Sequence, residues 1–261
     1  MPSIRSLVFP PPVWREYRFW LEIRELARNP LFREAPEAEE SQPVMLIPGF
    51  LTGDQTLGMM GSWLKRSGHR TCRAGIRLNV DCSEAAVGRL ESSLERFVAE
   101  EGEKAFVIGQ SRGGCFARVL AVRRPDLVRG IVTLGSPHLD PLAVHPMVWV
   151  QGDALATAGS LGVKGVVRHS CRFGDCCKYF WRELEGPFPS RVRFLSVYSR
   201  SDGIVDWRAC LDPGARSVEV DSTHCGMSVN SAAFELLHEA LRPRLRSRRF
   251  APAAARAEIA A

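Results

Sequence analysis

A glycine-flanked serine is the part of this sequence with the clearest chemistry. Gly109, Gln110, Ser111, Arg112 and Gly113 read G-x-S-x-G, directly after an apolar run and directly before an amphipathic segment. A strand that turns sharply into a helix strains the backbone of the central serine, and side chains at the flanking positions would clash. The helix start favours developing negative charge. A phosphate-binding Walker loop would need Gly-Lys-Ser/Thr, so the spacing predicts a nucleophile instead.

A serine hydroxyl becomes nucleophilic only when a histidine takes its proton and a carboxylate holds that histidine in the right tautomer. Of the six histidines, His224 is the strongest candidate, because it stands between the last apolar run (217–220) and the final helical segment. His138 and His145 follow the run at 130–135, and from there they could line the pocket.

The preferred acid is Asp202, which follows the apolar run 192–199 in a loop. Asp206 is the runner-up, and Asp221 and Asp140 are further alternatives, because each also follows an apolar run. The order serine, aspartate, histidine along the chain supports a catalytic triad.

An oxyanion in such a site needs two backbone N–H donors. One donor should be Arg112, the residue after the nucleophile. The other should come from the loop after the first apolar run, where Gly49 precedes Phe50 and lets its N–H point inward.

The elements that would position these residues alternate along the chain. We expect strands at 44–47, 69–74, 105–109, 130–135, 192–199 and 217–220, and helices at 54–67, 83–101, 112–124 and 228–241. Continuous apolar strands separated by amphipathic helices are typical of a parallel sheet covered on both faces. The expected fold class is therefore α/β, with a mostly parallel central sheet.

Five stretches resemble the α/β-hydrolase superfamily, particularly its bacterial lipases and esterases, and they occur in the right order. They are IPGFLTGD (47–54), GQSRGG (109–114), TLGSPH (133–138), YSRSDGIV (198–205) and THCGM (223–227). The resemblance covers about residues 43–241.

This resemblance implies an α/β-hydrolase fold and a serine esterase. It implies a triad of Ser111, Asp202 and His224, with Phe50 and Arg112 as oxyanion donors. It also implies a variable cap over the substrate. The arginine after the serine departs from the small residue or histidine often seen there, so its charged side chain would help to shape the pocket.

The sequence divides the chain into three regions. Residues 1–40 form an N-terminal extension, 41–241 the hydrolase domain and 242–261 a basic, alanine-rich tail. Within the domain, 141–190 has no clear period and reads as a cap or lid insertion. Apolar residues there favour an apolar acyl group, and we expect Met147 and Trp149, together with His138, to bind substrate.

The extension contains the helical segment WREYRFWLEIRELARN, with Pro30 to end it. Its broad apolar face has two interpretations. The helix packs against the body, or it rests on lipid or a lipid-like substrate as an interfacial helix. The basic tail makes an anionic membrane surface a candidate partner.

Composition sets the remaining expectations. The chain of 261 residues is 45% hydrophobic with a net charge of +6, so it is globular, and no basic patch interleaved with aromatics suggests a nucleic-acid partner. Without a signal peptide or spanning segment, we expect a cytoplasmic protein, peripheral to a membrane at most. Oligomeric state stays open.

Eight cysteines leave three alternatives: free thiols, a disulfide or a metal site. The spacing of Cys171, Cys176 and Cys177 fits no common zinc site, so we expect no metal and no cofactor. Free thiols suit a cytoplasmic chain. A disulfide among these three, Cys210 and Cys225 is the second alternative.

Two other functions are alternatives to ester hydrolysis. The acyl-enzyme could pass its acyl group to an alcohol or amine, which would make the protein an acyltransferase or a cyclase. The second alternative is a non-catalytic binding protein of the same fold. A triad whose residues occur in the expected order along the chain disfavours it.

Overall fold

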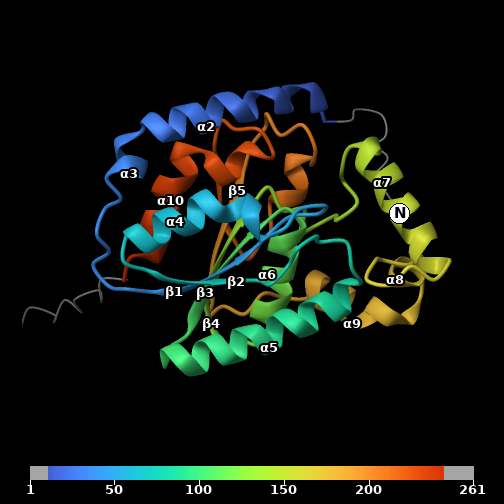
Figure 1. The fold of residues 1–261 in the computed structure, drawn as a ribbon. Coiled ribbons are helices and arrows are strands. Elements are labelled where there is room, and N and C mark those ends of the chain that lie inside the picture. Colours follow the sequence, from blue (N-terminus) through green and yellow to red (C-terminus); the bar gives the residue numbers. More distant parts are fainter. Residues whose placement is uncertain (1–10, 244–261) are drawn as a thin grey trace, which may run out of the picture.

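The computed structural model describes residues 11–243, and its centre is a six-stranded sheet (Figure 1). Every neighbouring pair of strands is parallel, in the order β2-β1-β3-β4-β5-β6. The expected parallel sheet is confirmed, and all six expected strands belong to it. The strands are β1 (Pro43–Ile47), β2 (Arg70–Arg73), β3 (Ala105–Gln110), β4 (Val128–Leu134), β5 (Arg193–Tyr198) and β6 (Arg216–Glu219).

Helices fill most of the connections between the strands. The expected helix at 83–101 has these bounds, whereas the segments at 54–67 and 228–241 each begin as a 3₁₀ turn. The helical elements are η1 (Val13–Arg18), α2 (Phe19–Arg28), α3 (Pro30–Arg33), η2 (Asp54–Leu57), α4 (Gly58–Arg66), α5 (Ser83–Glu101), α6 (Arg112–Arg123), α7 (Pro146–Ser160), α8 (Ser170–Phe173), η3 (Asp175–Cys177), α9 (Lys178–Glu185), η4 (Trp207–Cys210), η5 (Gly226–Val229) and α10 (Ser231–Leu241).

The strand order reverses between β1 and β3, and this reversal fixes where a site can form. From β1 the chain runs outward to β2, and from β3 it runs the other way to β6. Ligands of open α/β sheets bind outside the carboxyl ends of the strands at such a switch point. The loops after β1 and β3, which carry Phe50 and Ser111, flank this point.

Two hydrophobic cores lie on opposite faces of the sheet. One packs α5, α6 and α9 on one face, around residues such as Phe116 and Phe180. The other packs α2, α4 and α10 on the opposite face, around Trp63 and Phe234, whose rings meet edge to face. Helices thus cover both faces, as continuous apolar strands require.

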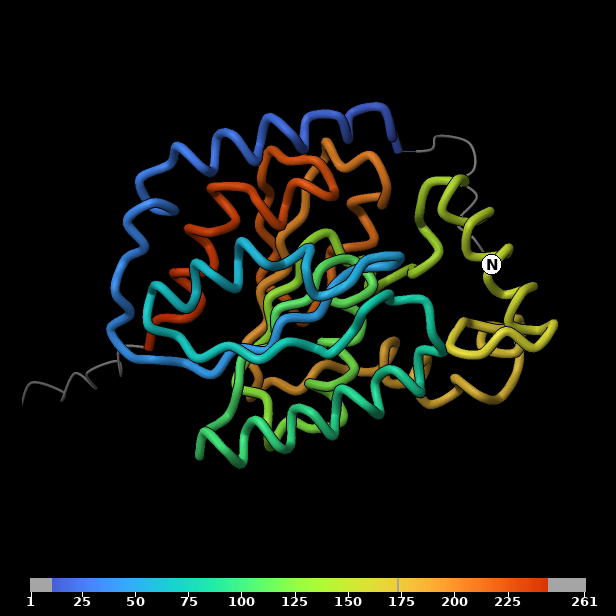
Figure 2. The backbone as a smooth tube through the Cα atoms, viewed as in Figure 1, coloured from blue at the N-terminus to red at the C-terminus, as the bar shows by residue number. Residues whose placement is uncertain are grey.

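The N-terminal segment lies along the outside of the second core, over the C-terminal part of the chain (Figure 2). Leu26 is fully buried, and Phe19 and Ile23 pack beside it. Helix α2 ends at Arg28, and Pro30 begins the short helix α3. The proline stop was therefore predicted correctly, and one face of the segment packs on the body.

The insertion at 141–190 is helical and gathers at one end of the molecule (Figure 2). Its last helix, α9, belongs to the body, because Phe180 packs edge to face on Phe116 at 5.7 Å between ring centroids. Its first part adjoins the carboxyl edge of the sheet, where Val144 forms an antiparallel bridge with Val205. One part of the insertion thus packs in the core, and another part adjoins the carboxyl edge of the sheet.

None of the helices within residues 11–243 is long and apolar enough to cross a membrane. The basic tail lies outside the described residues from position 244 onward.

Candidate catalytic site

Ser111 occupies the sharp turn between β3 and α6. Its φ of 52° and ψ of −122° are a strained conformation for a residue with a side chain. A Cβ atom at Gly109 would lie 2.3 Å from the Gly113 carbonyl oxygen, and one at Gly113 would lie 2.3 Å from that of Ile47. The flanking glycines are therefore required by close backbone contacts, for the reason that the sequence indicated.

His224 and Asp202 form a buried hydrogen-bonded pair. The distance between His224 Nδ1 and Asp202 Oδ2 is 2.7 Å, and both side chains are almost fully enclosed. The other carboxylate oxygen accepts the backbone N–H groups of Ile204 at 2.8 Å and Val205 at 2.7 Å. These three bonds fix the carboxylate, which in turn fixes the imidazole ring.

The serine turn and this pair meet at the end of β4. The N–H of Ser111 donates to Leu134 O at 2.8 Å. The next residue, Gly135, has a φ of +58°, and a Cβ there would lie 3.0 Å from His224 Nδ1 and 3.2 Å from Asp202 Oδ2. The Ser111 turn and the His224–Asp202 pair therefore both contact the end of β4. Among residues 11–243, no hydrogen bond joins the Ser111 hydroxyl to His224; such bonds are often long without substrate.

Burial alone would lower the pKa of His224. The charge of Asp202, its hydrogen bond to the ring and the charge of Glu16 outweigh burial and raise the pKa above the usual 6.5. A histidine in this environment is a stronger base than one in water, which suits proton removal from a hydroxyl.

The two expected oxyanion donors lie on adjacent loops. Arg112 is the first residue of α6, so its N–H has no intrahelical acceptor. Phe50 follows Gly49, where a Cβ would come 3.3 Å from Ser111 Cβ. The loop after β1 therefore lies against the serine, within reach of the same reacting group.

The Arg112 side chain forms hydrogen bonds to the segment that precedes α5. Its guanidinium donates to Asn79 O and Asn79 Oδ1, both at 3.1 Å, and to Asp81 O and Ser83 Oγ. Asn79 in turn donates to Pro48 O at 2.8 Å. Burial lowers the pKa of this arginine to about 10. The residue thus shapes the site by holding loops in place.

The alternative acids are engaged elsewhere. Asp206 accepts from Arg208 N at 3.0 Å, and Asp221 pairs with Arg18 at 3.2 Å. Asp140 accepts from Leu142 N at 3.0 Å.

The three residues expected to bind substrate fall in different surroundings. His138 is buried, with Nε2 3.0 Å from Thr133 Oγ1 and its ring against Phe194, and burial lowers its pKa to about 3. Its contacts are those of a core histidine. Trp149 donates from Nε1 to a backbone carbonyl in the insertion, and Met147 is exposed in the first turn of α7.

Glu16 is a residue that the sequence did not single out. Its Oε1 accepts the backbone N–H groups of Gly203 and His224, each at 2.9 Å, and its Oε2 accepts that of Cys225 at 3.0 Å. One carboxylate of the N-terminal segment therefore joins the loop of the candidate acid to the loop of the candidate base.

Glu22, which lies on α2, makes a second, buried connection between the N-terminal segment and the His224 loop. It accepts the Thr223 N–H at 2.9 Å, the Ser222 hydroxyl and the Asn230 amide. The two glutamates together hold the His224 loop from the outside of the molecule.

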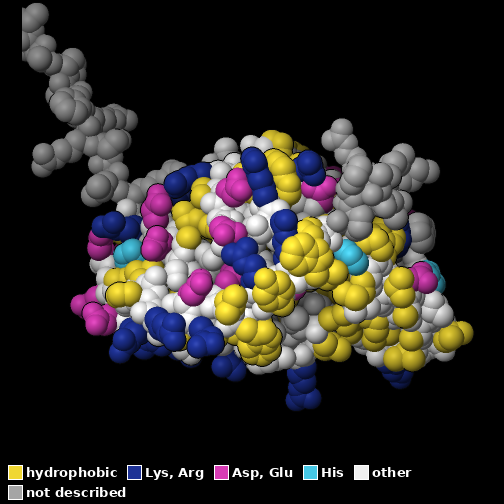
Figure 3. Space-filling model, turned by 90° about the horizontal axis from the view of Figure 1, so that it is seen from above, with side chains coloured by type: hydrophobic (Ala, Val, Ile, Leu, Met, Phe, Trp, Pro, Cys, Tyr) yellow, Lys and Arg dark blue, Asp and Glu magenta, His cyan; other side chains and the backbone are white. Residues whose placement is uncertain are grey.

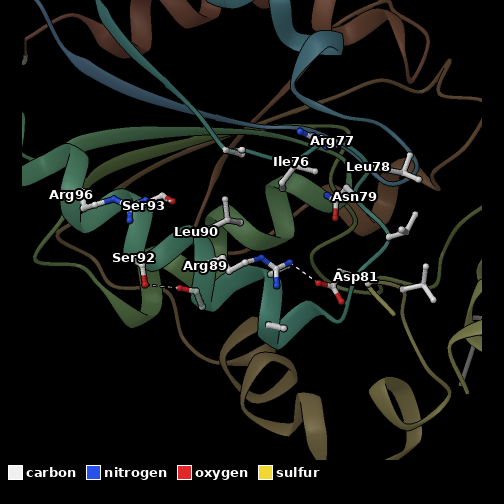
Figure 4. A pocket seen from close by; sticks show the side chains of 18 residues that line it. Ile76, Arg77, Leu78, Asn79, Asp81, Arg89, Leu90, Ser92, Ser93 and Arg96 are labelled. Atoms are coloured by element: carbon white, nitrogen blue, oxygen red, sulfur yellow. Dashed lines mark hydrogen bonds and ion pairs between the residues drawn. The ribbon is translucent and has the colours of Figure 1, made fainter. Parts of the chain in front are cut away.

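A cavity of about 910 Å³ lies away from Ser111, between helix α5 and the segment 74–81 (Figure 4). Its wall carries Arg77, Arg89 and Arg96, and Arg89 is paired with Asp81. None of the candidate catalytic residues lines it.

Large apolar side chains are exposed on η1, α2 and α7, and we call this surface the apolar rim (Figure 3). The aromatic residues Trp14, Tyr17 and Trp20 are 66%, 63% and 70% exposed. The other members are Leu21, Met147 and Val150.

Solved structures with a similar fold include lipolytic enzymes. The mature lipase BlEst2 of Bacillus licheniformis matches at a TM-score of 0.59 and 15% identity, over 79% of this chain and 94% of that chain. A metagenome-derived lipolytic enzyme of the LipS and LipT pair matches at 0.52 and 15%, over 78% and 93%. Aspergillus fumigatus lipase B matches at 0.51 and 18%, over 77% and 52%.

No family model matches the sequence. At these identities the similarity establishes the fold, so the expected α/β-hydrolase fold is confirmed.

Proposed function

We propose that the protein is a serine hydrolase that cleaves carboxylic esters with apolar acyl groups. The observation that carries the proposal is the buried 2.7 Å bond between His224 and Asp202, beside the strained Ser111 turn at the sheet's switch point. A histidine fixed by a carboxylate next to a serine is the arrangement that activates a hydroxyl.

In the proposed mechanism, Ser111 attacks the ester carbonyl while His224 Nε2 takes the hydroxyl proton. Asp202 stabilises the resulting imidazolium, and the N–H groups of Phe50 and Arg112 bind the tetrahedral oxyanion. His224 then gives the proton to the leaving alcohol. Water hydrolyses the acyl-enzyme by the same route, which restores the free serine.

The surroundings of the site support an apolar substrate. Met147 and Trp149 lie on α7, in the part of the insertion that adjoins the carboxyl edge. The apolar rim continues this surface over α2 (Figure 3). We therefore assign acyl-chain contacts to α7, with the insertion as a lid, and contact with a lipid surface to the apolar rim. His138, enclosed in the core, is left out of this assignment.

Covalent labelling together with an ester panel tests the proposal. A fluorophosphonate probe should label the protein once, at the peptide that contains Ser111. Hydrolysis of p-nitrophenyl esters should rise with acyl length and rise further once the ester exceeds its solubility. Labelling at another residue would refute the site. An acyl group transferred to added alcohol in preference to water would make the protein an acyltransferase.

The Glu16→Gln variant tests the connection between the two loops. His224 acts as a base only when it is neutral, so activity should fall as the pH drops through its pKa. In the wild type, the midpoint of this fall in kcat/KM should therefore lie above pH 6.5. Loss of the Glu16 charge should move this midpoint to lower pH, and loss of a charged acceptor should reduce kcat/KM by about tenfold. Rate profiles against pH measure both effects.

Glu25→Gln is the matched control, because it makes the same change at an exposed position of α2. The control should keep the wild-type profile. A Glu16→Gln midpoint equal to that of the control would show that Glu16 does not act through His224.

A further inference from the structure

Four cysteine side chains converge where the insertion meets the body. The Sγ atoms of Cys82, Cys171, Cys176 and Cys177 all lie within 4.8 Å of one another. Within this set, the Sγ atoms of Cys82 and Cys177 are 3.4 Å apart, and those of Cys176 and Cys177 are 3.8 Å apart. We propose that these four cysteines bind a structural zinc ion.

The spacing of the sulfurs matches tetrahedral coordination. Zinc–sulfur bonds of about 2.3 Å place the sulfurs of a regular tetrahedron about 3.8 Å from one another. A disulfide would bring two of the sulfurs to about 2.0 Å from each other, and it would not explain why the other two sulfurs lie close by. All eight cysteines lie within residues 11–243 and are free thiols there, so the four-sulfur cluster is not made of disulfides.

The ligands come from two parts of the chain. Cys82 is the residue before the first turn of α5, a helix of 19 residues whose positive end favours a thiolate. Cys171 lies on α8, and Cys176 and Cys177 lie on η3. Because Cys82 is 95 positions before Cys177, the three clustered cysteines alone did not indicate a zinc site.

Contacts beside the cluster hold its two halves together without metal. The backbone N–H of Phe180 donates to Glu84 at 2.9 Å, and Arg123 pairs with both Glu84 at 2.9 Å and Glu183 at 2.6 Å. These residues flank the ligands on α5 and on α9. The sulfurs are therefore arranged before any ion binds, which lowers the conformational entropy cost of binding.

The surroundings also compensate the charge of four thiolates and one Zn²⁺, a net charge of −2. The Arg112 guanidinium donates to Asp81 O at 2.5 Å and to Ser83 Oγ at 3.1 Å, the residues on either side of Cys82. The Arg168 N–H donates to Cys171 Sγ at 3.4 Å. A backbone donor to a ligand sulfur, such as the Arg168 N–H, orients the ligands of metal sites.

The burial pattern gives an ion a route into the cluster. Cys177 and Cys171 are buried, Cys82 is half-buried and Cys176 is exposed. The cavity beside α5 also reaches Asp81, next to Cys82 (Figure 4). Zinc is the metal that four thiolates in a closed tetrahedron favour for a structural role. The ion would fasten the middle of the insertion to α5.

Metal analysis of the full chain tests this proposal. Protein purified from zinc-supplemented cells under reducing conditions, without chelator, should contain about one zinc per chain by mass spectrometry. Cobalt added to the metal-free protein should give thiolate charge-transfer bands and the intense visible bands of tetrahedral Co²⁺. Neither result depends on esterase activity.

Cys176→Ser is the informative variant, because this ligand is exposed and its replacement leaves the core intact. It should reduce zinc content several-fold and weaken the cobalt spectrum. Cys225→Ser changes an exposed cysteine outside the cluster and should keep both. Background zinc with no cobalt bands in the reduced wild type would overturn the proposal.

Discussion

Ser111→Ala should reduce kcat for a p-nitrophenyl ester by about 10⁶-fold, because no acyl-enzyme can form without the hydroxyl. The residual rate should be that of water attacking an ester held by the Phe50 and Arg112 N–H groups. Alanine fits the turn as serine does, apart from the oxygen. Steady-state assays of ester hydrolysis measure the loss of kcat, and labelling by the fluorophosphonate should disappear as well.

Ser92→Ala is the control for this result, since Ser92 is on the solvent side of α5 and only donates to Gly88 O. It should retain full turnover and labelling. Turnover by Ser111→Ala within tenfold of this control would refute the nucleophile assignment.

Asp202→Asn should lower kcat by about 10⁴-fold at neutral pH. The amide can still accept the N–H groups of Ile204 and Val205 through its oxygen, so the loop keeps its anchor. Its NH₂ group would then face His224 Nδ1 and force the proton onto Nε2. A ring protonated at Nε2 cannot accept the serine proton. The pH profile should also change, because the carboxylate charge that raises the pKa of His224 is lost.

Asp206→Asn separates the two acids that the sequence left in competition. Asp206 is bonded to the N–H and guanidinium of Arg208, so its replacement should leave ester turnover close to the wild-type rate. Equal losses in both variants, or a larger loss in Asp206→Asn, would move the acid to Asp206.

Local sequence patterns determined the body of the fold. The apolar runs that became β1, β3, β4 and β5 and the periodic helix α5 depend on neighbouring residues, so they could be predicted from short windows. The Ser111 turn was predictable from the G-x-S-x-G spacing, although the backbone that crowds Gly113 belongs to Ile47, far away in sequence. The helices of the insertion were not predicted, because the stretch 141–190 as a whole shows no clear hydrophobic period.

Residues that act over long distances in sequence were not predictable. Glu16 and Glu22 look like the polar face of an amphipathic helix, and only the fold brings them to the His224 loop. Cys82 likewise gave no signal until it met the cysteines of the insertion. His138, expected at the substrate, packs its ring against Phe194, a contact that only the fold creates.

The tie from Glu16 to the His224 loop has a consequence for how the protein folds. The two residues are 208 positions apart, so forming this contact closes a loop of nearly the whole described chain. Such closure costs entropy before it gains any stabilisation, and contacts of this kind form late. The sheet can assemble from nearer neighbours, whereas the base and acid loops are tied down only afterwards. Recovery of enzymatic activity during refolding would therefore report the final step, not the collapse of the core.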